Sequence, residues 1–114
     1  SIIDALCGAL NLGDIGEHFP NTANNKNISS IKLLEKIVSI VPSNINIVNI
    51  DASIVLNEPK ISKYKSKIAS SLAPALKISK NQISIKGTTT NRLNFIDMKN
   101  GWGAEVIITL QKWN

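Results

Sequence analysis

Cysteine is almost absent from this chain of 114 residues, which contains only Cys7. A single cysteine excludes an internal disulfide framework, and the apolar run around Cys7 predicts a buried core thiol. Aromatic residues are also scarce, at 4%. None of them interleaves with a basic run, so the sequence does not indicate a platform on which nucleic-acid bases would stack.

Long apolar runs are missing as well, since none reaches the roughly 18 residues of a membrane span, and no signal-peptide pattern opens the chain. Hydrophobic residues nevertheless make up 43%, which predicts a packed core. The length fits one domain, residues 1–114, and at this size about 65% of the unfolded surface can be buried. The chain starts at Ser1 without methionine and already with a helical pattern. We therefore expect that a segment upstream has been removed or is missing.

Arginine is the third scarce residue, because 12 of the 13 basic residues are lysine and only Arg92 is arginine. Frequent lysine, isoleucine and asparagine are what an AT-rich genome produces, whereas base readout and bidentate phosphate contacts favour arginine. The net charge of +5 is therefore no sign of a nucleic-acid partner. A basic RNA-binding domain stays open as an alternative, and it would require strong RNA affinity that falls steeply with salt.

Apolar residues at helical spacing predict helices over residues 1–12, from Ser29 or Ser30 to Pro42, and from about residue 60 to 76. Either serine could cap the second helix. Pro74 should kink the third helix or end it a turn early. The side chains expected to face the core are Ile2, Ala5, Leu6 and Ala9, then Leu34, Ile37, Val38 and Val41, and finally Ile61, Ile68, Leu72 and Leu76.

Alternating apolar residues predict strands over residues 45–56, 83–86 and 103–111. Loops are expected at 23–27 and up to Gly101, with a short helical turn at 91–93. The order is therefore α, loop, α, β, α, β, β. The residues expected on the core face are Val48, Ile50, Ala52, Ile54 and Leu56 in the first strand, and Ala104, Val106, Ile108 and Leu110 in the last.

The ten residues from 13 to 22 combine two glycines, two acids, the only histidine, an aromatic residue and a proline. Glycine allows the backbone to approach a ligand closely, and Asp14, between Gly13 and Gly16, could meet hydroxyl groups at a defined angle. A simpler interpretation makes Gly13 a helix C-cap and Asp14 a solvated turn residue. The spacing alone leaves both interpretations open.

Two further segments favour an anionic ligand. Lys60 lies at a strand-to-helix junction, where backbone N–H groups are free. The run from Gly87 to Asn91 offers three threonine hydroxyls and N–H groups that suit diphosphate oxygens, although threonine is also common at an ordinary strand end. Lysines 63, 65 and 67 are expected to form a solvated face.

These segments together carry a resemblance. The sequence contains, in order, Gly13-Asp14-Ile15-Gly16-x-x-Phe19-Pro20-x-Thr22, Pro59-Lys60, Lys86-Gly87-Thr88-Thr89-Thr90 and Gly101-x-x-Ala104-Glu105. In order and spacing the chain resembles the 2-C-methyl-D-erythritol 2,4-cyclodiphosphate synthase family, over essentially its whole length. The resemblance implies a trimeric α+β, chorismate-mutase-like β-α-β-α-β-β domain with a mixed sheet and helices on one face. The first strand of that domain is absent from this chain.

The resemblance also implies a reaction and a set of site residues. The enzyme would be a phosphorus–oxygen lyase that cyclises 4-diphosphocytidyl-2-C-methyl-D-erythritol 2-phosphate and releases CMP in the non-mevalonate isoprenoid pathway. Thr89 would stabilise the transition state. The substrate-binding residues implied are Asp14, Ile15, Gly16, Phe19, Pro20, Asn21, Thr22 and Ala23 for the methylerythritol, Leu56, Asn57, Glu58, Pro59, Lys60, Ile61 and Ser62 for the cytidine, and Thr88, Thr90, Asn91 and Phe95 around the diphosphate.

The chain departs from the family at its metal sites. The family's zinc ligands, an Asp-x-His pair and a helix histidine, would lie upstream of Ser1, and His18 does not match one of them. Asn91 replaces a glutamate that binds a second cation, magnesium or manganese. Asn21 replaces an aspartate, and Met98 replaces an arginine at the trimer axis.

These departures leave two classes of function open. The first is the enzyme, with its upstream strand and zinc ligands outside this chain. The second is a non-catalytic trimeric module that binds cytidine nucleotides or has a structural role and has lost the metals. The partners implied are a cytidine-diphosphate-linked substrate and two further copies of the chain, with no nucleic acid and no membrane. The resemblance places such a protein in the bacterial cytoplasm or the plastid stroma.

Overall fold

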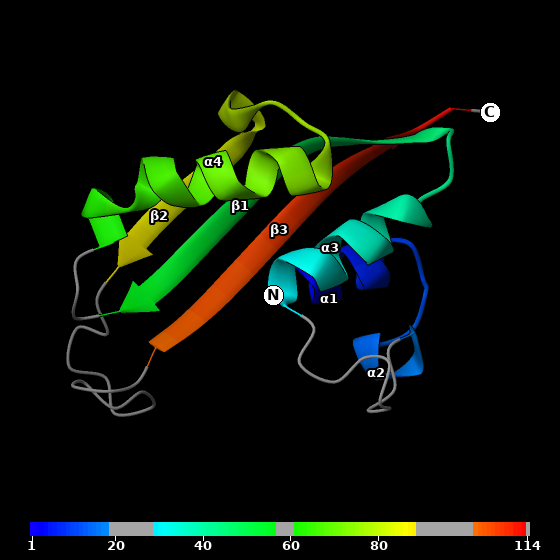
Figure 1. The fold of residues 1–114 in the computed structure, drawn as a ribbon, viewed down its shortest axis with the longest axis horizontal. Helices are drawn as coiled ribbons and strands as arrows, with labels where there is room; N and C mark the ends of the chain where they lie inside the picture. Colours follow the sequence, from blue (N-terminus) through cyan, green and yellow to red (C-terminus); the bar gives the residue numbers. More distant parts are fainter. Residues whose placement is uncertain (19–28, 57–60, 89–101, 114) are drawn as a thin grey trace.

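A mixed three-stranded sheet is the frame of the computed structural model, which describes residues 1–18, 29–56, 61–88 and 102–113. Its strands are β1 (Ile45–Leu56), β2 (Ile83–Thr88) and β3 (Trp102–Lys112), in the spatial order β2-β1-β3. β1 is parallel to β2 and antiparallel to β3 (Figure 1). A parallel pair needs a crossover connection, and here a helix supplies it.

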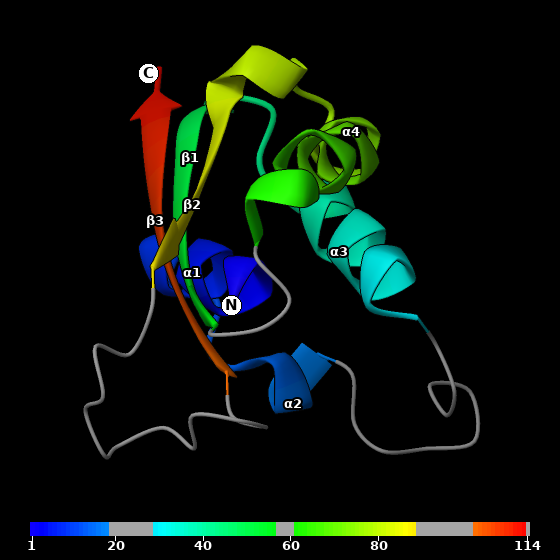
Figure 2. The same ribbon diagram turned by 90° about the vertical axis from the view of Figure 1, so that its left-hand side faces the viewer.

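Three helices of eight or more residues pack on one face of this sheet: α1 (Ile2–Ala9), α3 (Ser30–Ser39) and α4 (Lys65–Leu76). Figure 2 shows α3 and α4 beside the sheet, which is seen there almost edge-on. Three short elements complete the described part: α2 (Ile15–His18) and the 3₁₀ turns η1 (Ile61–Lys63) and η2 (Lys80–Gln82). The expected α+β class and mixed sheet are confirmed.

The core lies between the helices and the sheet. Small residues on α4, among them Ala69 and Ala73, are buried against the strands, where Ile50 and Ile85 are buried too. A second cluster joins α1 to α3 through Leu6, Cys7 and Ile37, which are at most 1% exposed. Burial of one such aliphatic side chain contributes about 1.5–3 kcal/mol. These contacts hold α1 and α3 together against the sheet.

Three residues expected to face the core are exposed, namely Ala9, Val48 and Ala104. Val48 is 42% exposed, whereas Ile47 and Ile50 are buried. The pairing of β1 with β3 shifts between Ile47 and Asn49, so Val48 is the extra residue of a β-bulge. The expectation from strict alternation was wrong at Val48, because a bulge reverses the facing of every residue before it.

The ends of the first helix also differ from expectation. α1 ends at Ala9 with Leu10 as its C-cap, and Asn11 takes the left-handed conformation (φ 55°) that commonly follows a helix. Gly13, at φ +84°, therefore belongs to the next turn, and its interpretation as the C-cap of this helix was wrong. The residues after it form the short helix α2, which periodicity did not predict because four residues carry no pattern.

The other two helices begin and end close to the expected positions. Ser29 is the N-cap of α3, and its hydroxyl accepts a hydrogen bond from the Lys32 N–H at 3.2 Å. α4 continues through Pro74 to Leu76, so the early end considered for this helix was wrong. Ile61 belongs to η1 and not to α4. The loop at 23–27 and the turn at 91–93 lie outside the described residues.

Candidate functional site

Two of the predicted site segments begin at the same end of the sheet, where the parallel strands β1 and β2 have their carboxyl ends. The strands run in parallel, and Val55 pairs with Thr88 at the last position of their register. β1 ends at Leu56 and β2 at Thr88, where the predicted cytidine and diphosphate segments respectively begin. Loops that follow the carboxyl ends of parallel strands commonly bind ligands. The structure therefore places the starts of these segments side by side.

The turn η1 lies at the same end of the sheet. Ile61 is partly buried against the core, and its Cγ2 atom lies 1.9 Å from the position that a Cβ on Gly87 would occupy. Ser62, the last residue of the predicted cytidine segment, is exposed. The turn before α4 thus lies directly on the strand that precedes the threonine run. Sequence reasoning did not find this contact, because no local pattern links the two positions.

The glycine-flanked aspartate forms the other part of the predicted site. Asp14 is exposed, and its Oδ1 atom accepts a hydrogen bond from the Glu17 N–H at 3.1 Å. This bond caps α2 and fixes the direction of the carboxylate. Gly13 takes a positive φ just before it. Gly16 is exposed beside it. The binding role expected for Asp14 stays a prediction.

Within one chain the two parts of the site lie far from each other. In Figure 1, α2 is at the lower right, beyond α1, whereas the arrowheads of β1 and β2 and the turn before α4 are at the left. Figure 2 likewise shows α2 below and away from η1. The described part of a single chain therefore does not bring Asp14 next to Ile61 and Thr88.

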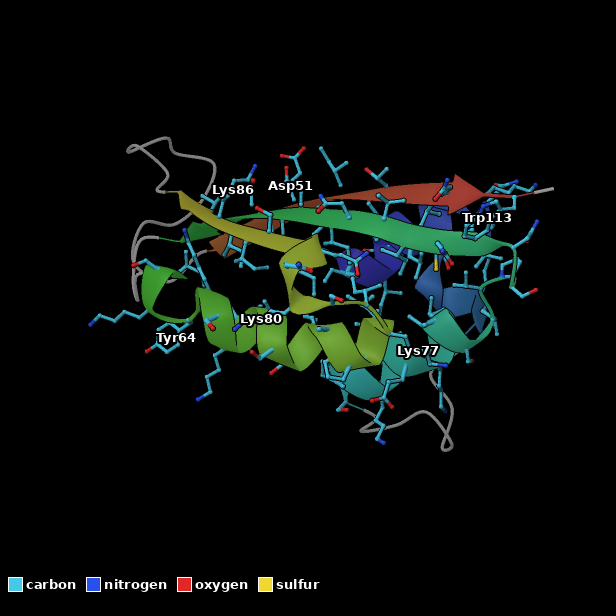
Figure 3. The ribbon with its side chains drawn as sticks, turned by 90° about the horizontal axis from the view of Figure 1, so that it is seen from above. Asp51, Tyr64, Lys77, Lys80, Lys86 and Trp113 are labelled. Atoms are coloured by element: carbon cyan, nitrogen blue, oxygen red, sulfur yellow. The ribbon has the colours of Figure 1, made fainter. Side chains whose placement is uncertain are left out.

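Charged groups near the strand ends lie on two sides of the sheet. Lys86 is paired with Asp51, its Nζ atom lying 3.0 Å from Oδ1 and 3.1 Å from Oδ2. Both project from the sheet face that is opposite to α4 (Figure 3). Asp51 was not predicted as part of any site. The exposure expected for lysines 63, 65 and 67 is confirmed, as they lie on η1 and α4.

The one cysteine is unsuited to nucleophilic chemistry. Cys7 is 1% exposed, which confirms the predicted core thiol. Burial raises the pKa of this thiol above its ordinary value of 9.0, and the negative charges of Asp4 and Asp14 raise it further. A thiolate would therefore be disfavoured at neutral pH.

Among the residues that the structure describes, no three histidine, cysteine, aspartate or glutamate side chains gather closely enough to hold a metal ion. These residues therefore do not fit a zinc ion. In the same described ranges, no helix is long and apolar enough to cross a membrane.

Many of the predicted site residues lie outside the described residues or are described only by their backbone. Of Ile15, Leu56 and Thr88 only the backbone is described. Thirteen predicted site residues lie outside the described residues: Phe19, Pro20, Asn21, Thr22, Ala23, Asn57, Glu58, Pro59, Lys60, Thr89, Thr90, Asn91 and Phe95.

Comparison with known proteins gives consistent results. The sequence model of the YgbB family matches residues 1–111. The chain is 40% identical, over 114 residues, to the 2-C-methyl-D-erythritol 2,4-cyclodiphosphate synthase of Desulfitobacterium hafniense (strain DSM 10664 / DCB-2), and the match covers 98% of this chain and 72% of that protein. It is 41% identical over 116 residues to the bifunctional enzyme IspD/IspF of Aliarcobacter butzleri, of which it spans 31%.

Solved structures show the same likeness in three dimensions. The structure described as "IspF (Plasmodium falciparum) CDP complex" superposes with a TM-score of 0.85 at 33% identity and covers 100% of this chain and 69% of that one. The bifunctional IspDF from Campylobacter jejuni superposes with a TM-score of 0.87, also at 33% identity, and the chain spans 31% of it. The similarity in sequence and the similarity in fold thus point to one family.

Proposed function

This chain belongs to the YgbB family of 2-C-methyl-D-erythritol 2,4-cyclodiphosphate synthases, and from that premise we propose that it acts in the closure of the cyclic diphosphate. The substrate would be 4-diphosphocytidyl-2-C-methyl-D-erythritol 2-phosphate. An oxygen of its 2-phosphate attacks the β-phosphorus, the bond from that phosphorus to the bridging oxygen breaks, and CMP leaves with that oxygen. The reaction is that of a phosphorus–oxygen lyase, in the bacterial cytoplasm or the plastid stroma.

The protein's part in this reaction is to position the two phosphates, because the nucleophile is in the substrate. We assign the cytidine to residues 56–62, the diphosphate to residues 88–91 with Phe95 nearby, and the methylerythritol hydroxyls to Asp14–Gly16 and residues 19–23. Thr89 would stabilise the transition state. The observation that supports this assignment is the parallel register, which pairs Val55, the residue just before the cytidine segment, with Thr88, the first residue of the diphosphate segment. One known relative of similar fold is described as a CDP complex.

We further propose that the complete site forms between copies of the chain in a homotrimer. Two observations support this assembly. The Asp14 segment and the strand ends lie on different sides of one chain (Figure 1), so a second copy could supply the missing half. The sheet face opposite to the helices also carries exposed apolar side chains, among them Val48 and Ile107. In this proposal residues 1–114 are one chorismate-mutase-like domain, completed by a first strand from outside these residues.

The family uses divalent metals, but the described residues of this chain do not fit one. No step of the reaction is therefore routed through a metal here. The proposed zinc ligands lie upstream of Ser1. Asn91, an amide in the place of a carboxylate, would be a weak ligand for magnesium or manganese.

The first test is nucleotide selectivity. We expect CDP and CMP to bind more tightly than ADP and AMP, because a slot shaped for a pyrimidine excludes the larger purine. Lys60→Ala should weaken CDP binding by about 1–3 kcal/mol if its ammonium group meets a buried phosphate or base oxygen. Lys63→Ala is the matched control, since Lys63 is exposed three residues away. Isothermal calorimetry measures all four ligands against each variant.

The outcomes separate the two functions. Equal affinity for cytidine and adenine nucleotides would contradict the proposed site. Selective binding together with formation of the cyclic diphosphate, followed by phosphorus NMR, would establish the enzyme. Selective binding without any product, even after an upstream Asp-x-His strand and histidine are added and Asn91 is changed to Glu, would identify a binding module instead.

A further inference from the structure

The helix-facing side of β2 has a gap in its row of side chains. Ile83 and Ile85 are buried against the helices, and the alternation of a strand puts position 87 next in that row. Position 87 is glycine. Its place is taken by Ile61, whose Cγ2 atom lies 1.9 Å, and whose Cβ atom lies 3.2 Å, from where a Cβ at 87 would be. Real Cβ atoms do not approach other atoms so closely. Ile61 can therefore pack here only because residue 87 is a glycine and has no side chain.

Ile61 is also held from the opposite direction. Its carbonyl oxygen accepts a hydrogen bond from the Tyr64 N–H at 2.8 Å, which closes the turn η1. α4 begins at Lys65 directly after this turn, and Ala69 on its next turn is part of the core. Ile61 therefore connects the anchored start of α4 to the end of β2.

We propose that Ile61 is a positioning residue, whose side chain occupies the gap at Gly87 and so holds the cytidine segment and the diphosphate segment at a fixed separation. This inference rests on the proposed function. Residue 61 then contributes to the ligand site through its backbone, while its side chain is directed at β2. The contact lies one residue before Thr88 and at the end of residues 57–60, so it is placed to couple the two segments.

This coupling has a specific consequence for ligand binding. In the proposed assignment, cytidine alone would contact only the segment of residues 56–62, whereas CDP would also reach residues 88–91. If Ile61 sets the separation, its disturbance should reduce the gain in affinity that the two phosphates provide. A loss of general stability would instead lower the affinity for both ligands together. The ratio of CDP affinity to cytidine affinity therefore distinguishes positioning from a merely structural role.

The experiment uses the full 114-residue chain and fills the gap from the strand side. Gly87→Val should lower the CDP-to-cytidine affinity ratio by about tenfold, because small displacements of paired binding groups are costly. Ile61→Ala, which empties the gap, should lower the ratio by a smaller factor. The double variant with both changes moves bulk from one side of the contact to the other, and we expect it to recover most of the ratio. Ser84→Val, at an exposed position of the same strand, is the control and should leave the ratio unchanged.

Hydrogen exchange at the Tyr64 amide gives a readout that needs no ligand. Gly87→Val should speed this exchange, and the double variant should slow it again. If neither the unchanged chain nor any variant binds cytidine nucleotides, the proposed function fails. The exchange rates alone then show whether Ile61 packs against Gly87. If Gly87→Val does not fold, the comparison of Ile61→Ala with the unchanged chain decides it. Unchanged ratios and unchanged exchange in the variants that fold would overturn the proposal.

Discussion

At the scale of single residues, burial decides the chemistry of the one thiol. Cys7 lies on α1, in the buried cluster that it forms with Leu6 and with Ile37 of α3. Removal from water, together with the charges of Asp4 and Asp14, raises the pKa of the thiol. In the unfolded chain the same thiol has its ordinary pKa. The folded state therefore binds the thiol proton more tightly than the unfolded state does.

This difference predicts how stability depends on pH. Because the folded pKa is the higher one, the contribution is fully present below the ordinary value of 9.0 and is lost as the pH rises above it. We expect the free energy of unfolding to fall more steeply above pH 9.0 in the unchanged chain than in Cys7→Ala. Urea titrations of both proteins across this range measure the effect, and parallel pH profiles would contradict it.

At the scale of elements, the corner between α1 and α2 depends on one backbone conformation. Gly13 takes φ +84°, which residues with a side chain rarely adopt. A Cβ at this position would also lie 1.9 Å from a carboxylate oxygen of the Glu17 side chain. The backbone N–H of the same Glu17 donates a hydrogen bond to Asp14 Oδ1. The left-handed backbone at Gly13 is therefore the feature of this corner that requires a glycine.

Substitution at this corner tests the backbone requirement at Gly13. Gly13→Ala should destabilise the fold by about 1–2 kcal/mol, because alanine pays the left-handed backbone cost. Gly8→Ala is the matched control: a Cβ at Gly8 would have nothing within 4 Å, and alanine within a helix should stabilise by about 0.5–1 kcal/mol. Urea denaturation gives both values. Equal effects of the two changes would show that the backbone at Gly13 is not constrained as described.

At the scale of the whole molecule, the helices among the described residues all cover the same face of the sheet. α1, α3 and α4 pack on one side, whereas the Asp51–Lys86 pair projects from the other (Figure 3). Ile107 on β3 is 63% exposed on that open side. An open face that carries large apolar residues is typical of a surface for assembly. It is the surface that the proposed homotrimer would bury.

A charge placed on this face should prevent the assembly. We expect the unchanged chain to be a trimer at micromolar concentration, and Ile107→Lys to shift it to a monomer, because a buried lysine without a partner is costly. Ser70→Lys, at an exposed position of α4, should leave the trimer intact. Light scattering gives the mass and circular dichroism confirms folding. A stable monomer of the unchanged chain would exclude the proposed shared site.

Sequence patterns were sufficient wherever local physics sets the structure. Periodicity located β1 at its observed ends, Ile45 and Leu56, and a serine before α3 indicated its cap, which the structure resolves as Ser29. The combination of motifs also determined the family, because each motif is short but their order and spacing are specific. These features need no knowledge of which segments meet in space.

Tertiary structure decided what depends on contacts between distant segments. Val48 points away from the core because the pairing of β1 with β3 includes a bulge, which a single strand's sequence does not encode. Gly87 faces Ile61, 26 positions earlier in the chain, and only the crossover through α4 brings them together. The separation of Asp14 from the strand ends is likewise a property of the packed chain (Figure 1). The sequence by itself thus determined the longer helices, the strands and the family, whereas their packing decided which site residues can act together in one chain.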